Sequence, residues 1–198
     1  ELKISEDSNA YDPAVSVGTD GSVYCAWTTF RNGSYRIAFT EFDGTSPETT
    51  YITPADRHCY YPGLTTDPSG RPCLTWVSFD GPECVTNTSL RSAFVQHGLR
   101  KHIQSFWINE RRVHLALRDQ GAWKKFDDDN AGREDGDIVT LRRGYWPRPL
   151  FLSDGTPLVF CRIPVETADS PWKFSTRAVI WQGDTWETPR GLSDEATA

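Results

Sequence analysis

The stretch YYPGLTTDPSGRPCLTW, residues 60–76, occurs three times in related form and decides the fold. Residues 11–27 read YDPAVSVGTDGSVYCAW, and residues 145–161 read YWPRPLFLSDGTPLVFC. Each copy has a tyrosine, a proline two residues later, a glycine eight residues after the proline, and a tryptophan or cysteine six residues after the glycine. Apolar runs on both sides of the glycine predict a two-stranded hairpin in each copy.

Further strands follow each hairpin. Asn32-Gly33 predicts a tight turn, and residues 34–42 and 49–53 predict a third and a fourth strand before the pattern restarts at Tyr60. The third strand recurs, because the run SYRIAF of residues 34–39 reappears as SLRSAF at residues 89–94. Four antiparallel strands per repeat predict an all-β chain that folds as a β-propeller of four-stranded blades. We expect about four blades in a single domain or fragment, at residues 11–56, 60–98, 103–142 and 145–195.

The expected third strands end at unevenly spaced glycines, namely Gly44, Gly98, Gly121 and Gly183. The interval from Gly98 to Gly121 is too short for an outer strand of one blade and an inner strand of the next. Either these blades are degenerate or residues are absent there, and we favour absence. Residues 1–8 resemble the outer strand of a neighbouring blade. Because ring closure removes exposed sheet edges, we expect a natural domain of five or more blades.

Charge and hydropathy exclude two classes of partner. A net charge of −6 and a pI near 5.2 argue against binding to nucleic-acid phosphates, which requires clustered Lys and Arg. No apolar run approaches the roughly 18 residues of a membrane-spanning helix. The chain also lacks methionine and a signal-peptide pattern, so we expect a processed piece of a secreted or periplasmic protein.

Five cysteines without a C-x-x-C pair indicate neither a disulfide framework nor a structural zinc site. Cys25, Cys73 and Cys161 follow the repeat glycine, where we expect buried thiols that act as small apolar side chains. Cys59 and Cys84 lie in connecting segments, and whether they pair is left open.

With these residues in hand, the chain resembles bacterial propellers whose blades read P-x-[VL]-x4-[DS]-x-G-x5-W, in the style of sialidase-like and TolB-like repeat proteins. The resemblance covers nearly the whole chain and implies the propeller fold, whereas such blades serve glycosidases, lyases, lectins and accessory domains alike. The S-x-D-x-G-x-T-W box of sialidases is absent. Ser153-Asp154-Gly155-Thr156 has a different spacing and no tryptophan, which counts against a sialidase.

The residues that precede the repeat prolines are the main site candidates: Asp12, Tyr61 and Trp146. In a propeller, the innermost strand starts near one mouth of the central channel, where ligands bind. The structural alternative is that the proline sets φ at a strand start and the rim tolerates any residue before it. Trp172, which lies in a connector like Trp146, is a further candidate for stacking on a sugar ring. By contrast, Trp27, Trp76 and Trp107 share the second-strand position and are expected to pack between blades.

Asp12-Pro13 also resembles the Asp-Pro of arabinanase-type and invertase-type propeller glycosidases, whose aspartate serves as base or nucleophile. A catalytic Asp12 would need a second carboxylate, held about 5–5.5 Å away for retention or further for inversion. Glu41 and Glu110 are available, and nothing in the spacing selects one of them.

Two other patterns have structural explanations beside functional ones. Arg36, Arg91 and Arg177 recur on third strands and would either clamp a carboxylate or pair with acidic neighbours. The acidic stretch from Asp127 to Asp137 offers oxygen ligands for calcium but does not fit the EF-hand pattern, and a solvated loop is its default explanation. We expect no other cofactor and no other metal.

These patterns favour a non-catalytic propeller scaffold or binding module that holds a glycan or a protein partner at the channel mouth. The alternative is a carbohydrate-active enzyme, a propeller-type glycoside hydrolase with paired carboxylates at the same mouth. A third hypothesis is an incomplete ring that is active only once further blades, or self-association with a second copy, close it.

Overall fold

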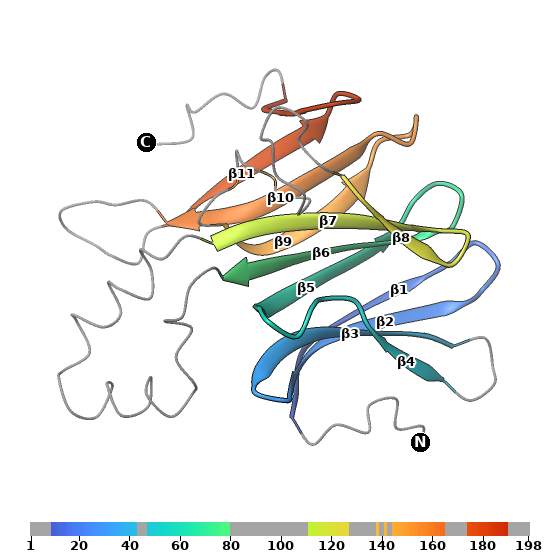
Figure 1. The fold of residues 1–198 in the computed structure, drawn as a ribbon. Helices are drawn as coiled ribbons and strands as arrows, with labels where there is room; N and C mark the ends of the chain where they lie inside the picture. Colours follow the sequence, from blue (N-terminus) through green and yellow to red (C-terminus); the bar gives the residue numbers. More distant parts are fainter. Residues whose placement is uncertain are drawn as a thin grey trace, which may run out of the picture.

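The computed structural model describes residues 9–42, 47–79, 111–126, 138, 141, 144–164 and 174–189. Within these ranges twelve strands form three antiparallel sheets of four strands each, and none of the described residues is α-helical (Figure 1). The predicted all-β architecture of four-stranded sheets is therefore confirmed. The described part of the chain also holds no helix that is long and apolar enough to cross a membrane.

Each sheet is ordered along the chain, and we call the sheets blades 1, 2 and 3. Blade 1 contains β1 (Ala10–Val17), β2 (Val23–Arg31), β3 (Ser34–Phe42) and β4 (Glu48–Tyr51). Blade 2 contains β5 (His58–Thr66), β6 (Pro72–Phe79), β7 (Arg111–Asp119) and β8 (Ala122–Lys125). Blade 3 contains β9 (Tyr145–Phe151), β10 (Pro157–Pro164), β11 (Phe174–Trp181) and β12 (Trp186–Glu187).

The expected count of four blades is wrong for the described residues. The sequence predicts separate blades at residues 60–98 and 103–142, yet β6 pairs with β7 in one sheet, from Cys73 opposite Leu117 to Phe79 opposite Arg111. The third strand of blade 2 is thus β7, and Gly121 follows the end of that strand. Residues 80–110, which include Gly98, lie outside the described ranges, so the expectation of degenerate blades or absent residues there stays a prediction.

Two apolar cores hold the three blades together, and β6 contributes to both because successive side chains of a strand point to opposite faces. Leu74 and Trp76 face blade 1, and Cys73 and Val77 face blade 3. The core between blades 1 and 2 consists of Tyr24, Ala26, Ile37, Phe39, Cys59, Leu74, Trp76 and Ala116. The core between blades 2 and 3 consists of Cys73, Val77, Val113, Leu115, Leu117, Ile138, Leu141, Val159, Cys161, Ile163, Val179 and Trp186.

The repeat glycines take the predicted turn positions. Gly21, Gly70 and Gly155 have φ values of 87°, 84° and 87°, as the first hairpin turn of each blade requires. Trp76, at 3% exposure, packs between blades 1 and 2 as predicted. Trp27 is also buried, at 4% exposure, but its cluster consists of blade 1 residues alone, and Trp107 lies outside the described residues.

The cysteine expectation is confirmed for the second strands, because Cys25, Cys73 and Cys161 are free and buried. Cys59 is likewise buried, in the core between blades 1 and 2, and Cys84 lies outside the described residues.

Candidate functional site

A β-bulge interrupts the inner strand of every blade at the Tyr-x-Pro motif. The strand register shifts between Tyr11 and Ala14 in β1, between Tyr60 and Gly63 in β5, and opposite Phe160–Arg162 in β9. The middle residue of each motif has a left-handed backbone, with φ of 50° at Asp12, 57° at Tyr61 and 48° at Trp146.

These residues adopt this backbone conformation at an energetic cost. A residue before proline favours extended backbone, and a left-handed φ costs a non-glycine residue roughly 1–2 kcal/mol. Glycine or asparagine would adopt this φ at lower cost, yet three large or charged side chains occupy the three equivalent positions. Strain that recurs with such side chains is typical of functional positions.

The bulges bring the three predicted residues together, and we call Asp12, Tyr61 and Trp146 the bulge site. The inner strand β5 contacts both β1 and β9. The rings of Tyr61 and Trp146 lie 5.2 Å apart between centroids, at an interplanar angle of 52°. Burial raises the pKa of Tyr61, and the negative charge of Asp12 raises it further. The predicted convergence of side chains from three blades is therefore present.

Three arginines that the sequence analysis did not select surround these residues. Arg148 donates a hydrogen bond from Nη1 to the Pro62 carbonyl oxygen at 3.0 Å. The guanidinium of the fully buried Arg111 lies 3.8 Å from the centroid of the Tyr145 ring. Arg162 lies 5.6 Å from the Trp146 ring centroid. Arg148 directly follows the third repeat proline and Arg162 directly follows Cys161, the last residue of the third repeat, whereas Arg111 lies on β7, outside the repeats.

The electrostatic environment of Asp12 is mixed. Partial burial raises the pKa of Asp12, and the positive charge of Arg148 opposes that rise without cancelling it. Asp12 is solvent-exposed, whereas Tyr61 and Trp146 are half-buried. The site thus presents one accessible carboxyl beside two aromatic rings and a guanidinium.

The structure does not bring Glu41 to Asp12 as a second carboxylate. Glu41 forms an ion pair with Arg118 of blade 2. Tyr11, next to Asp12, lies opposite Thr28 of β2, and Thr28 lies opposite Ile37 of β3. Ile37 is therefore the residue of β3 that lies level with the bulge. The four residues from Ile37 to Glu41 span about 13 Å, beyond the distance between paired carboxylates in glycosidases. Glu110 lies outside the described residues.

The remaining sequence candidates divide into structural residues and residues that are not described. Arg36 donates from Nε and Nη2 to the Thr53 carbonyl oxygen at 3.0 and 2.7 Å, so it bonds backbone where the sequence suggested an acidic side chain. Arg177 is exposed on β11. Trp172, Arg91 and residues 127–137 lie outside the described ranges. Across the described ranges, no three His, Cys, Asp or Glu side chains are grouped so that they could hold a metal ion.

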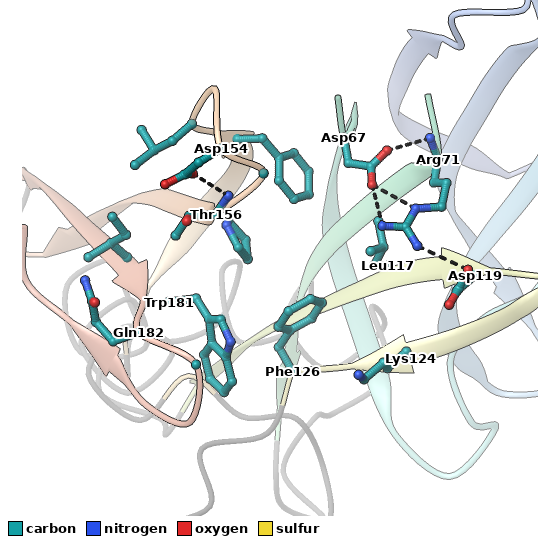
Figure 2. Close-up of a pocket in the computed structure, with 16 residues that line it drawn as sticks. Asp67, Arg71, Leu117, Asp119, Lys124, Phe126, Asp154, Thr156, Trp181 and Gln182 are labelled. Carbon is teal, nitrogen blue, oxygen red and sulfur yellow. Dashed lines mark hydrogen bonds and ion pairs between the residues drawn. The ribbon is translucent and has the colours of Figure 1, made fainter. Parts of the chain in front are cut away.

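A pocket of about 610 Å³ lies between blades 2 and 3, and no motif of the sequence indicates it. Four hairpin turns supply its rim, so its residues are scattered along the chain (Figure 2). We call it the interblade pocket; it is lined by Asp67, Arg71, Leu117, Asp119, Lys124, Phe126, Phe151, Leu152, Asp154, Gly155, Thr156, Pro157, Ile180, Trp181, Gln182 and Gly183. Asp67 is six residues beyond Tyr61 on the same hairpin, so about 20 Å separates the pocket from the bulge site.

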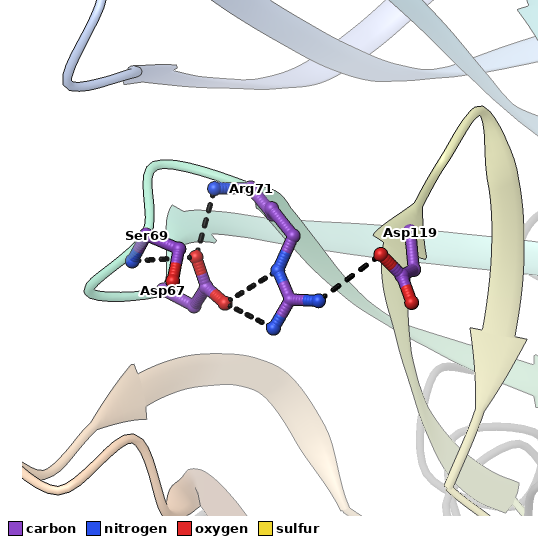
Figure 3. A network of polar contacts seen from close by, with 4 residues as sticks. All are labelled: Asp67, Ser69, Arg71 and Asp119. Atoms are coloured by element: carbon purple, nitrogen blue, oxygen red, sulfur yellow. Dashed lines mark hydrogen bonds and ion pairs between the residues drawn. The ribbon is translucent and has the colours of Figure 1, made fainter.

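A network of polar contacts fixes one side of the interblade pocket (Figure 3). The Asp67 carboxylate accepts hydrogen bonds from the backbone N–H groups of Ser69 and Arg71 at 3.0 and 2.8 Å. It also accepts from Nε of Arg71 at 2.8 Å and pairs with Nη2 at 2.7 Å. Nη1 of Arg71 reaches Asp119 at 3.1 Å. Arg71 is therefore held between a turn of β5–β6 and the end of β7.

No protein-family model matches the sequence, and no curated protein matches it either. Solved structures are similar to it in fold. A Hadza microbial sialidase has a TM-score of 0.58 at 12% identity, over 92% of this chain and 37% of the sialidase. An ulvan lyase of a new polysaccharide lyase family has a TM-score of 0.54 at 14% identity, over 88% of this chain and 42% of the lyase. A family 117 glycoside hydrolase of the marine bacterium Zobellia galactanivorans has a TM-score of 0.54 at 14% identity, over 92% of this chain and 55% of the hydrolase.

Identities this low show a likeness of fold alone. Together with the three four-stranded sheets, the likeness confirms a propeller-type fold. The chain spans 37–55% of the length of these three proteins. Membership of the bacterial repeat group and a total of five or more blades stay predictions.

Proposed function

We propose that this chain is part of a non-catalytic propeller module that binds a glycan at the bulge site, and that the protein is secreted or periplasmic. The observation that carries the proposal is the Tyr61–Trp146 ring pair, which a strained backbone holds beside Asp12 and Arg148. Aromatic rings pack against the C–H faces of a sugar, and the carboxyl and guanidinium groups bond its hydroxyls. The structural neighbours act on carbohydrates according to their names, which supports this class of ligand.

The charge of the site favours an acidic glycan. Arg148 and Arg162 are both exposed near Trp146, and Asp12 is the carboxyl that shares an electrostatic interaction with Arg148. Because burial raises the pKa of Asp12, its negative charge is disfavoured there. A uronic acid carboxylate or a sugar sulfate would pair with the two arginines, since guanidinium groups bind such anions bidentately.

The test is calorimetric titration with an oligogalacturonate and a chondroitin sulfate oligosaccharide, with xylohexaose as the neutral comparison. Trp146→Ala and Arg148→Ala are each expected to weaken binding of the acidic oligosaccharides at least tenfold, as the loss of about 1.4 kcal/mol predicts. Arg177→Ala removes an exposed arginine of blade 3 that lies outside the bulge site, so it is the matched control and should leave affinity unchanged. No binding, or an equal loss in the control, would contradict the proposal.

The raised pKa of Asp12 gives one specific reason to test a second function, a glycoside hydrolase. In a glycoside hydrolase, the carboxyl that protonates the leaving oxygen of the glycosidic bond is one whose pKa is raised, as that of Asp12 is. Asp12→Asn separates the two functions, because an enzyme loses about 10²–10⁴-fold in turnover, whereas a binding module has no turnover to lose. Release of reducing sugar from the bound oligosaccharide, compared between the original protein and Asp12→Asn, measures the difference.

A further inference from the structure

The interblade pocket has the composition of a second sugar site, distinct from the bulge site. Its floor is apolar and aromatic, with Trp181 and Phe126 at the centre of the view in Figure 2. Its rim is polar and belongs to separate turns of blades 2 and 3. A volume of about 610 Å³ is within the range of small-molecule sites in proteins.

The aromatic floor is fixed by its own packing. Trp181 meets Phe126 edge to face, with centroids 5.5 Å apart and an interplanar angle of 89°. On its other side Trp181 contacts Trp186, 5.3 Å away, and Trp186 is 2% exposed. Trp181 itself is half-buried, so part of its surface remains accessible in the pocket. A held, partly accessible indole is a suitable platform for the C–H face of a sugar ring.

The polar rim offers both hydrogen-bond donors and hydrogen-bond acceptors. Asp67 and Arg71 are engaged with each other in the network of Figure 3, so they act as a rigid wall. Lys124, Asp154 and Gln182 are exposed; Lys124 lies on β8, and Asp154 and Gln182 lie on two different turns of blade 3. A carboxylate, an ammonium and an amide suit the vicinal hydroxyls of a saccharide, each of which both donates and accepts.

The charge of the lining distinguishes this pocket from the bulge site. Three carboxylates (Asp67, Asp119 and Asp154) face two cations (Arg71 and Lys124), which leaves one negative charge in excess. An acidic sugar would be repelled by this excess, whereas an uncharged one would not. The lining therefore favours a neutral saccharide.

We propose that the interblade pocket binds a neutral saccharide on Trp181, with Lys124, Asp154 and Gln182 bonding its hydroxyls. Asp67 of the pocket directly follows β5, and Tyr61 of the bulge site lies in the middle of that strand, about 20 Å away. A module with two such sites holds two glycan segments at once, and the second contact is made at the high effective concentration that the first one creates.

The experiment is a calorimetric titration with xylotetraose and cellotetraose, with tetragalacturonate as the acidic counterpart. Trp181→Leu and the double variant Lys124→Ala/Gln182→Ala are each expected to weaken binding of a neutral tetrasaccharide about tenfold. The double variant changes only exposed side chains, so it tests the pocket even if Trp181→Leu loses its fold, which circular dichroism reports. Arg177→Ala is the control, because this exposed side chain lies outside both sites and should leave neutral-sugar affinity unchanged. Trp146→Ala reports whether the neutral sugar binds at the bulge site instead.

Two results would overturn the inference. Absence of measurable binding by either neutral tetrasaccharide to the unmodified protein is the first. The second is neutral-sugar binding that survives both pocket variants or disappears in Trp146→Ala, since the sugar would then bind elsewhere. Because acidic-glycan binding to the bulge site is measured separately, failure of one site is distinguishable from failure of the other.

Discussion

Replacing Gly63 with alanine should destabilise the protein by driving two inner strands apart. Gly63 lies in the bulge of β5, where that strand approaches β9. A methyl group on Gly63 would lie 2.6 Å from Oγ1 of Thr75 and 3.0 Å from Cδ of Pro149, and it would overlap the Pro147 carbonyl oxygen. Two of these three obstacles belong to the β9 chain itself, one of them its backbone, so rotating a flexible side chain does not relieve the overlap.

The size of the effect follows from two contributions. Forcing an extra methyl group into packed surroundings costs about 1–3 kcal/mol. The buried Thr75 hydroxyl donates to the Pro147 carbonyl oxygen at 3.0 Å, and losing that bond costs a further amount of about 0.5–1.5 kcal/mol. We therefore expect Gly63→Ala to lower the free energy of unfolding by about 2–4 kcal/mol.

Urea denaturation followed by tryptophan fluorescence measures the loss, with Gly33→Ala as the matched control. Gly33 has a φ of 84°, and a methyl group on it would have no atom within 4 Å, so its substitution carries conformational strain without a clash. That strain costs roughly 1–2 kcal/mol. If Gly63→Ala lowers the free energy of unfolding by no more than Gly33→Ala does, the close approach of β5 and β9 does not require a glycine at position 63.

Three further perturbations test other parts of the structure. Burial raises the pKa of Asp12 above its ordinary value of 3.8, so the folded protein holds this proton more tightly than the unfolded chain. The free energy of unfolding should therefore fall as pH rises from 3.8 through the raised pKa of the folded state. Asp12→Asn should remove this pH dependence from urea titrations. Burial also raises the pKa of Cys161 to about 12 and that of Cys73 further still. Iodoacetamide at pH 8 should therefore label both thiols only after unfolding, as measured by peptide mass spectrometry. Labelling of either thiol in the native protein would contradict its burial. Asp67→Asn should lower the free energy of unfolding by about 1–3 kcal/mol, because the Asp67 side chain is only 5% exposed and its hydrogen bonds are weakened. Asp119→Asn should lower it by less than about 1 kcal/mol, because the Asp119 side chain is 49% exposed. Equal thermal midpoints of the two variants would contradict the anchoring role of Asp67.

The repeat makes the inner hairpins predictable because their signals are local. Tyrosine, proline and glycine at fixed spacing specify a strand start and a turn, and all three hairpins form where the motif places them. The predicted blade count fails at the next strand. The run at residues 89–94 matches the third strand of blade 1, yet β7 fills that role in blade 2. Strand pairing is a contact between distant residues, and an alternating pattern does not say which strand is the partner.

The candidate site is predictable in its residues but not in its geometry. Asp12, Tyr61 and Trp146 are the variable positions of the motif, and the structure adds that each has a left-handed backbone, which the following proline does not predict. Arg111 joins them from β7, whose sequence carries no such motif, and Arg162 joins them from β10, directly after the motif residue Cys161. The interblade pocket forms where four separate turns meet, so the sequence of no single turn predicts it.

The bulge also bears on how such a site would arise and diversify. A gene segment that encodes one blade carries one bulge, so each tandem duplication adds one more side chain to the same place. The side chain at the bulge is absent from the two apolar cores between blades, with the exception of the half-buried Tyr61 at the edge of one. Substitution there is therefore largely decoupled from blade packing, and new ligands become accessible by exchanging one residue per repeat while the sheets stay as they are.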